Sequence, residues 1–198
     1  MASSSTTIEQ TCQKCGGTHK IEFIPSVNVA LSPELKDKVK SGELFIWECP
    51  SCGQRNLISE PFLYHDPDEK VLILLSSSGV RAEGLAEGYT GRLVGSVGEL
   101  VEKISIFDAG LDDVCMELCK MITRQELGKD VSLKFFAQSG ADSELRFTYP
   151  EDGQMQVIEV GFNVYEDCAG ILRRNPEIKK AALGLAKVDQ EWLSNFIG

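Results

Sequence analysis

The sequence has no long hydrophobic run and no recognisable export signal. Its longest unbroken apolar run, Val71–Leu75, is far shorter than the roughly 20 residues that a membrane-spanning helix needs. Residues 1–7, MASSSTT, have neither the basic start nor the apolar middle of a secretory signal, and we expect them to form a disordered tail. These absences predict a soluble protein without a membrane partner.

Basic residues are also scarce, since 20 Lys and Arg stand against 30 Asp and Glu, for a formal net charge of −10. Both parts of the chain share this imbalance: residues 1–75 carry 7 basic and 10 acidic side chains, and residues 76–198 carry 13 and 20. A negative field repels phosphate backbones. We therefore expect no nucleic-acid partner.

Motifs of catalysis and nucleotide binding are missing as well. Gly84, Gly88 and Gly91 are not followed by the residues of a phosphate-binding loop or a dinucleotide fingerprint, so they are typical of a linker. His65 and Asp66 resemble a general acid/base pair, but a histidine beside an aspartate in a turn is more often a surface hydrogen bond. We assign no catalytic and no cofactor-binding residue, and expect the protein not to be an enzyme.

Cysteine, in contrast, is well represented, with seven residues in a chain of 198. Four of them form two similar motifs, Cys12-Gln13-Lys14-Cys15-Gly16 and Cys49-Pro50-Ser51-Cys52-Gly53. Two thiolates three residues apart around a tight turn are typical of metal ligands, and glycine after the second cysteine tolerates a positive φ. Paired motifs of this kind favour a reducing compartment, which predicts a cytoplasmic location.

The four cysteines predict one structural zinc ion held by Cys12, Cys15, Cys49 and Cys52. The spacer at 16–48 is long, but a pair of strands and a helix within it would bring its ends together. A shell closed by four thiolates has no open position for water, so the metal is expected to stabilise rather than to catalyse. His19, four residues after Cys15, is a possible substitute ligand that we expect to face solvent.

Two alternatives to zinc remain. Cys-Pro-x-Cys-Gly also resembles the motif of rubredoxins, in which four thiolates hold a redox-active iron, and ligand type alone does not exclude iron. We favour zinc because rubredoxin-like carriers are much shorter than this chain. The other alternative is that both motifs are packed thiols or a redox dithiol.

The remaining cysteines, Cys115, Cys119 and Cys168, offer three thiols without a fourth ligand. Cys115 and Cys119 lie four apart on a predicted helix and therefore share one face. A second thiol site is one interpretation, but small buried thiols in an apolar core explain these residues more simply.

The pattern of apolar residues and turns predicts an α+β protein. We expect a tail at 1–7, a zinc-ribbon-like antiparallel β domain at 8–78, a linker at 79–92, and at 93–198 a C-terminal domain of helices on a small antiparallel sheet. Strands are predicted at 20–30, 43–48, 56–64, 71–75, 131–138, 144–149 and 154–160. Helices are predicted to start near Ser32, Ser96, Asp112, Asn163 and Asp189.

Several segments together resemble the CpXC domain family, a prokaryotic group named after its Cys-Pro-x-Cys motif. They are the first cysteine motif, 41–45 leading into the second motif, 63–65, 102–107 and 110–113. The similarity spans residues 8–125, although Gln13 stands where the family motif has proline. It implies a metal site and offers no catalytic residue to carry over to this chain.

Taken together, these features predict a non-enzymatic binding module, stabilised by metal, whose partner is another protein or a small ligand. A rubredoxin-like iron carrier is the first alternative. An enzyme with a site between its domains is the second.

Overall fold

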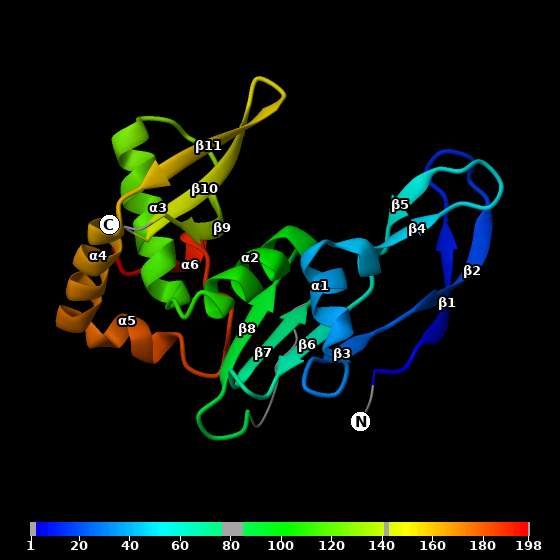
Figure 1. Cartoon of the computed structure of the whole chain (residues 1–198), viewed down its shortest axis with the longest axis horizontal. Helices are drawn as coiled ribbons and strands as arrows, with labels where there is room; N and C mark the ends of the chain where they lie inside the picture. Colours follow the sequence, from blue (N-terminus) through cyan, green and yellow to red (C-terminus); the bar gives the residue numbers. More distant parts are fainter. Residues whose placement is uncertain (1–2, 77–84, 141–142, 198) are drawn as a thin grey trace. The chain divides into compact units, whose positions relative to one another are not determined.

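The computed structural model describes residues 3–76, 85–140 and 143–197 (Figure 1). It confirms the α+β class, with N-terminal strands that carry the cysteine motifs and C-terminal helices beside a small antiparallel sheet. The chain divides into two compact units, Met1–Val101 and Glu102–Gly198, and the boundary falls inside helix α2, Val97–Asp108. Within the described ranges, every helix is too short or too polar to cross a membrane.

The strands of the first unit form two separate hairpins and one mixed sheet. Their bounds are β1 Thr6–Thr11, β2 Thr18–Phe23, β3 Ser26–Asn28, β4 Ile46–Glu48, β5 Arg55–Leu57, β6 Phe62–Asp66, β7 Val71–Leu75 and β8 Thr90–Val94. Strands β1 and β2 pair antiparallel, and so do β4 and β5. In the mixed sheet the order is β8-β7-β6-β3, with parallel pairing at β3–β6 and β7–β8 and antiparallel pairing at β6–β7. Strands β6 and β7, which overlap the strands predicted at 56–64 and 71–75, thus form a hairpin.

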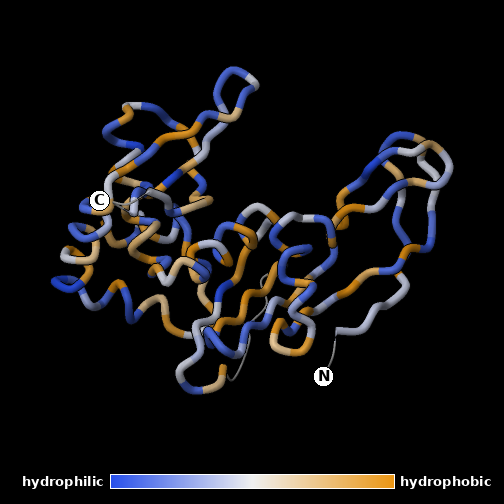
Figure 2. Tube along the Cα trace, in the orientation of Figure 1, coloured by the Kyte–Doolittle hydropathy of each residue, from blue (hydrophilic) through white to orange (hydrophobic). Residues whose placement is uncertain are grey.

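The mixed sheet carries the core of the first unit. Figure 2 shows hydrophobic residues concentrated along β6 and β7. Phe62, Tyr64 and Ile73 are each at most 1% exposed. The ring of Phe62 packs edge-on against Phe45, at a centroid distance of 4.9 Å. This contact anchors the segment that leads into the second cysteine motif.

Helix α1, Glu34–Lys40, confirms the helix predicted after Ser32. The strand predicted at 43–48 starts instead with a 3-10 turn, η1 Glu43–Phe45, and only Ile46–Glu48 is extended. Gly42 has φ +76°, a left-handed conformation that turns the chain sharply after α1 and lets Phe45 reach the core.

Two expected boundaries differ from the observed elements. Thr6 and Thr7 belong to β1 rather than to the tail expected at 1–7, because they pair with Phe23 and Glu22. In the linker expected at 79–92, residues 79–84 lie outside the described residues. Residues 90–92 belong to β8, because they pair with 71–73 of β7.

The second unit combines a three-stranded meander with helices. Its elements are α3 Asp113–Leu127, β9 Lys134–Ser139, β10 Glu144–Glu151, β11 Gln154–Val160, α4 Phe162–Arg174, α5 Pro176–Ala181, β12 Leu185–Ala186 and α6 Gln190–Ser194. The predicted meander is confirmed, with β10 between β9 and β11 and antiparallel pairing throughout. Two of the predicted helix starts carry a side-chain cap, because Asp112 accepts a hydrogen bond from the Cys115 N–H and Asp189 accepts one from the Trp192 N–H. Gly128, with φ +61°, ends α3.

Five charged side chains lie buried between α2, α3 and the meander: Glu102, Lys103, Asp113, Glu117 and Lys120, each at most 5% exposed. Two lysines face three carboxylates in this cluster, and the partly exposed Lys134 adds a third positive charge, 3.3 Å from Glu102. Lys103 contacts Asp113 at 2.9 Å and Glu117 at 3.2 Å, and Lys120 contacts Glu102 at 2.9 Å and Glu117 at 2.8 Å. Glu102 also accepts the N–H of Phe135 at 2.9 Å. This buried charge network ties α2 and α3 to the meander.

Candidate metal centre

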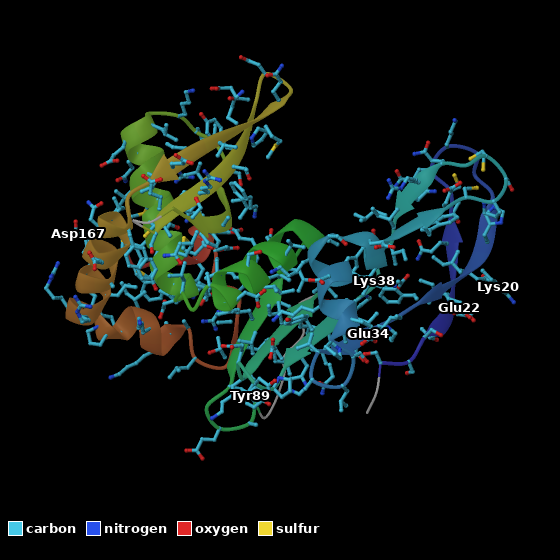
Figure 3. The ribbon with its side chains drawn as sticks, in the orientation of Figure 1. Lys20, Glu22, Glu34, Lys38, Tyr89 and Asp167 are labelled. Carbon is cyan, nitrogen blue, oxygen red and sulfur yellow. The ribbon has the colours of Figure 1, made fainter. Side chains whose placement is uncertain are left out.

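Each cysteine motif forms the loop of one hairpin. The first lies between β1 and β2 and the second between β4 and β5; we call these two hairpins, with their loops, the cysteine hairpins. Figure 3 shows sulfur atoms gathered where the ends of the two hairpins meet. Chain segments about 35 residues apart in sequence therefore supply one cluster.

The two loops repeat the same backbone hydrogen bonds. The N–H of Cys12 bonds to the carbonyl of Gly17 at 2.9 Å, and the N–H of Cys49 bonds to that of Gln54 at 2.8 Å. The N–H groups of Gly16 and Gly53 return to the carbonyls of Cys12 and Cys49. Both glycines are left-handed, with φ of +71° and +67°, which confirms the role predicted for them.

The four sulfur atoms lie at the spacing of a metal shell. The Sγ atoms of Cys12, Cys15, Cys49 and Cys52 all lie within 4.8 Å of one another. Two sulfur–sulfur contacts connect the hairpins: Cys12 Sγ to Cys52 Sγ and Cys15 Sγ to Cys49 Sγ, both at 3.7 Å. Sulfur atoms about 2.3 Å from one zinc ion at tetrahedral angles are about 3.8 Å apart. The residues present therefore fit one tetrahedral cation.

Burial is uneven around the cluster. Cys12 and Cys49 are each 1% exposed, Cys52 is half-buried and Cys15 is exposed. One side of the cluster therefore faces the protein and the other faces solvent.

The protonation of the cluster also indicates that it needs a cation. Backbone hydrogen bonding from the Cys15 segment stabilises the thiolate of Cys12 and lowers its pKa to about 6. The backbone N–H of Gln54 favours the thiolate of Cys52 in the same way, but burial and the neighbouring sulfurs outweigh it and raise the pKa of Cys52 to about 12. The thiolate of Cys52 therefore does not form at neutral pH unless a positive charge compensates it.

Two residues outside the motifs touch the sulfurs. Asn56, at the centre of β5 and 7% exposed, donates from Nδ2 to the Sγ of Cys12 at 3.7 Å and accepts the N–H of Gln13 at 3.1 Å. The half-buried His19, on β2, has its Nε2 3.5 Å from the Sγ of Cys49, whereas the sequence predicted that it would face solvent. Both contacts join one cysteine hairpin to the other. The sequence singled out His19 by its place four residues after Cys15, whereas no local motif marks Asn56.

The other cysteines lie in the core of the second unit. Cys115, Cys119 and Cys168 are each at most 1% exposed. Hydrogen bonding with the thiols of Cys115 and Cys168, together with burial, raises the pKa of Cys119 well above its usual range. Among the described residues the only metal-competent group is the one in the cysteine hairpins. These three thiols thus form part of the apolar core.

His65 and Asp66 do not form a pair. Adjacent residues of a strand point to opposite faces. Asp66 accepts hydrogen bonds from Lys36 at 3.1 Å and Tyr64 at 3.3 Å, whereas His65 contacts Asn28 and Tyr89. A cavity of about 230 Å³ is lined by Val29, Pro33, Lys36, Asp66, Asp68 and Glu69, without His65.

The three glycines that were typical of a linker do not lie together in one loop of the described residues. Gly84 lies outside the described residues. Gly88, with φ +80°, is in the turn before β8, and Gly91 is inside β8.

Comparison with known proteins supports the resemblance seen in the sequence. Neither the curated proteins nor the solved structures include a significant match. The family model described as CpXC protein matches residues 10–120, which include both cysteine motifs and more than half of the chain. The chain therefore belongs to the CpXC family.

Proposed function

We propose that this protein is a zinc-binding scaffold: a structural ion held by Cys12, Cys15, Cys49 and Cys52 fixes the cysteine hairpins, which then serve as a non-enzymatic binding module. The observation that carries the proposal is the Sγ–Sγ distance of 3.7 Å between the two hairpins. It matches the distance between two sulfur ligands of a tetrahedral zinc ion. Among the described residues, neither hairpin has a sheet partner beyond its own two strands. An isolated two-stranded hairpin is marginally stable, so a metal bound by both hairpins would determine whether they are folded.

Zinc is preferred to iron because the chain contains a second α+β unit that a minimal electron carrier does not need. The sulfur geometry itself suits both metals, so a rubredoxin-like carrier is the second candidate. Visible absorption separates them, since a ferric tetrathiolate is coloured and zinc is colourless. All seven cysteines are free thiols in the structure, and a reducing compartment such as the cytoplasm suits this state.

An exposed apolar pair on the second cysteine hairpin is the surface that we assign to a protein partner. Ile46 and Leu57 are paired across β4 and β5 and are 37% and 54% exposed. Both lie on the hairpin that carries Cys49 and Cys52, so loss of the metal would disorder this surface too. Binding should therefore depend on the metal.

Elemental analysis of the purified protein tests the proposal. We expect one equivalent of zinc in the wild type and less than a tenth of that in Cys49→Ser. Cys168→Ala, which removes a thiol outside the cluster, is the matched control and should retain full zinc. A wild type with far less than one equivalent of any metal would contradict the scaffold function, and one equivalent of iron would favour the electron carrier.

Partner binding is tested by cross-linking and pull-down with wild type, Leu57→Asp and Cys49→Ser. A partner that depends on both Leu57 and the metal supports the binding module. A partner retained equally by all three proteins would contradict the assignment of this surface.

A further inference from the structure

His19 stands beside the thiolate cluster without belonging to it. Its Nε2 is 3.5 Å from the Sγ of Cys49 and 3.3 Å from the Oγ of Ser51, and its ring centroid is 6.1 Å from that of Trp47. The group of ligand atoms that lie within 4.8 Å of one another contains the four cysteines and not His19. An imidazole nitrogen thus lies just outside a shell that is already complete.

The distance between Nε2 and the Sγ of Cys49 is the distance expected between two ligands of one zinc ion. In a tetrahedral zinc shell, a nitrogen at about 2.0–2.1 Å and a sulfur at about 2.3 Å are roughly 3.6 Å apart. The observed distance of 3.5 Å is close to this value. His19 would therefore need only a small movement toward the ion if a position became free.

Cys15 is the ligand whose position is most easily freed. It is exposed, whereas Cys12 and Cys49 are almost fully buried. Electrophiles and oxidants reach exposed thiolates first. Cys15 is therefore the ligand that chemical damage would remove from the metal most readily.

Gly17 keeps open the space between Cys15 and His19. A Cβ atom on Gly17 would lie 3.1 Å from the Nε2 of His19 and 3.4 Å from the Sγ of Cys15. Unlike Gly16, Gly17 does not adopt a positive φ, so its backbone does not require glycine. What glycine provides here is room on the side where both side chains approach the backbone.

We infer that His19 is a reserve ligand, which takes the place of Cys15 when that sulfur no longer binds the metal. The exchange converts a shell of four thiolates into a shell of three thiolates and one imidazole, and zinc forms stable structural sites with both. The inference rests on the metal site proposed above. Its consequence is that the cysteine hairpins keep their ion, and their fold, after damage to the exposed ligand.

Cobalt(II) binding tests this inference, because its visible spectrum reports both the geometry and the number of thiolates. We expect Cys15→Ala to bind one equivalent, with affinity lowered by no more than about 100-fold and with its ligand-field bands moved to shorter wavelength. Adding His19→Ala to Cys15→Ala should abolish binding or leave it at least tenfold weaker than in Cys15→Ala. The double variant is essential because water could supply a fourth ligand in the single one.

Two further variants give matched controls. Cys12→Ala removes a buried thiolate that has no reserve ligand and should bind far more weakly than Cys15→Ala. Gly17→Ala should bind cobalt normally alone, but in combination with Cys15→Ala it should prevent the rescue. Circular dichroism of the helices confirms that the second unit stays folded in each variant.

The outcomes separate the two proposals. If the wild type does not bind cobalt, the metal site itself is wrong. If the wild type binds but Cys15→Ala does not, or if adding His19→Ala changes nothing, the metal site stands and the reserve ligand is wrong.

Discussion

The amide of Asn56 donates from Nδ2 to the Sγ of Cys12 at 3.7 Å, although the two residues are 44 positions apart in sequence. The Oδ1 of the same amide accepts the N–H of Gln13. One side chain of the second cysteine hairpin thus binds both a sulfur and a backbone group of the first. Residues that donate to metal ligands orient them, and their loss usually lowers metal affinity by about 10–100-fold.

We therefore predict that Asn56→Ala weakens zinc binding by about 10–100-fold without abolishing it, because all four thiolates remain. Competition with a chromophoric chelator measures the change. Gln54→Ala is the matched control, because its side chain donates to the neighbouring Arg55 carbonyl. Equal affinities of Asn56→Ala and wild type would mean that the hydrogen bond does not orient Cys12.

Removal of the metal should expose Trp47, which lies on β4 two residues before Cys49 and is 7% exposed. The protein has two tryptophans, so Trp192→Phe leaves Trp47 as the one reporter. In that variant a strong chelator should shift the emission to longer wavelength, and added zinc should reverse the shift. Trp47→Phe, which reports on the second unit through Trp192, should show little change, and a similar shift in both variants would contradict a local role of the metal.

The cysteine cluster was predictable because its information is local. Two Cys-x-x-Cys turns, each followed by glycine, specify their own geometry within six residues, and the observed φ of Gly16 and Gly53 agrees with this. The capped helices were predictable for the same reason, since Asp112 and Asp189 each bond to an N–H three residues ahead. The contacts of Asn56 and His19 with the sulfurs depend on how the two hairpins meet, and the sequence around either residue does not show this.

Strand β1 and the buried charge network could not be predicted, because their amino-acid composition is typical of exposed segments. Strand β1 shows little alternation of apolar and polar residues, because five polar residues surround Ile8. It forms because β2 pairs with it along its whole length. Glu102, Lys103 and Glu117 are of the residue types that usually mark a solvated helix face. They are buried in ion pairs between α2 and α3, such as that of Lys103 with Glu117, and the sequence of either helix alone does not show this pairing.

The glycines after the second cysteine of each motif give a prediction about backbone strain. Gly16 has φ +71° and a Cβ there would meet nothing within 4 Å, so Gly16→Ala introduces strain without a clash. A left-handed alanine costs about 1–2 kcal/mol, which should weaken metal binding about 5–30-fold because binding and folding are coupled. Chelator competition measures the loss. Gly16→Asn should lose less, because asparagine tolerates this conformation better; the reverse order would show that strain is not the cause.

Glu117 holds the centre of the buried charge network, and its removal should destabilise the second unit. Its carboxylate contacts Lys103 and Lys120 and accepts the side-chain N–H of Gln190 at 2.8 Å. Glu117→Gln preserves the shape but removes the negative charge between two buried ammonium groups, at an expected cost of about 3–5 kcal/mol. Urea denaturation at pH 7, followed by helical circular dichroism, measures this cost. Glu126→Gln, on the exposed side of the same helix, should change stability by less than about 0.5 kcal/mol.

The pH dependence of this difference identifies its cause. Burial alone would raise the pKa of Glu117, but the charges of Lys103 and Lys120 outweigh burial. Together with hydrogen bonds from Gln190 and Lys120, they lower the pKa below the ordinary value of 4.5. A carboxyl group with a lowered pKa in the folded protein stabilises it above pH 4.5, and this contribution is lost as the pH falls from there through the folded pKa. The stability gap between wild type and Glu117→Gln should therefore narrow between pH 4.5 and pH 3. A gap that stays constant over this range would mean that Glu117 acts through its shape and hydrogen bonds, and not through its charge.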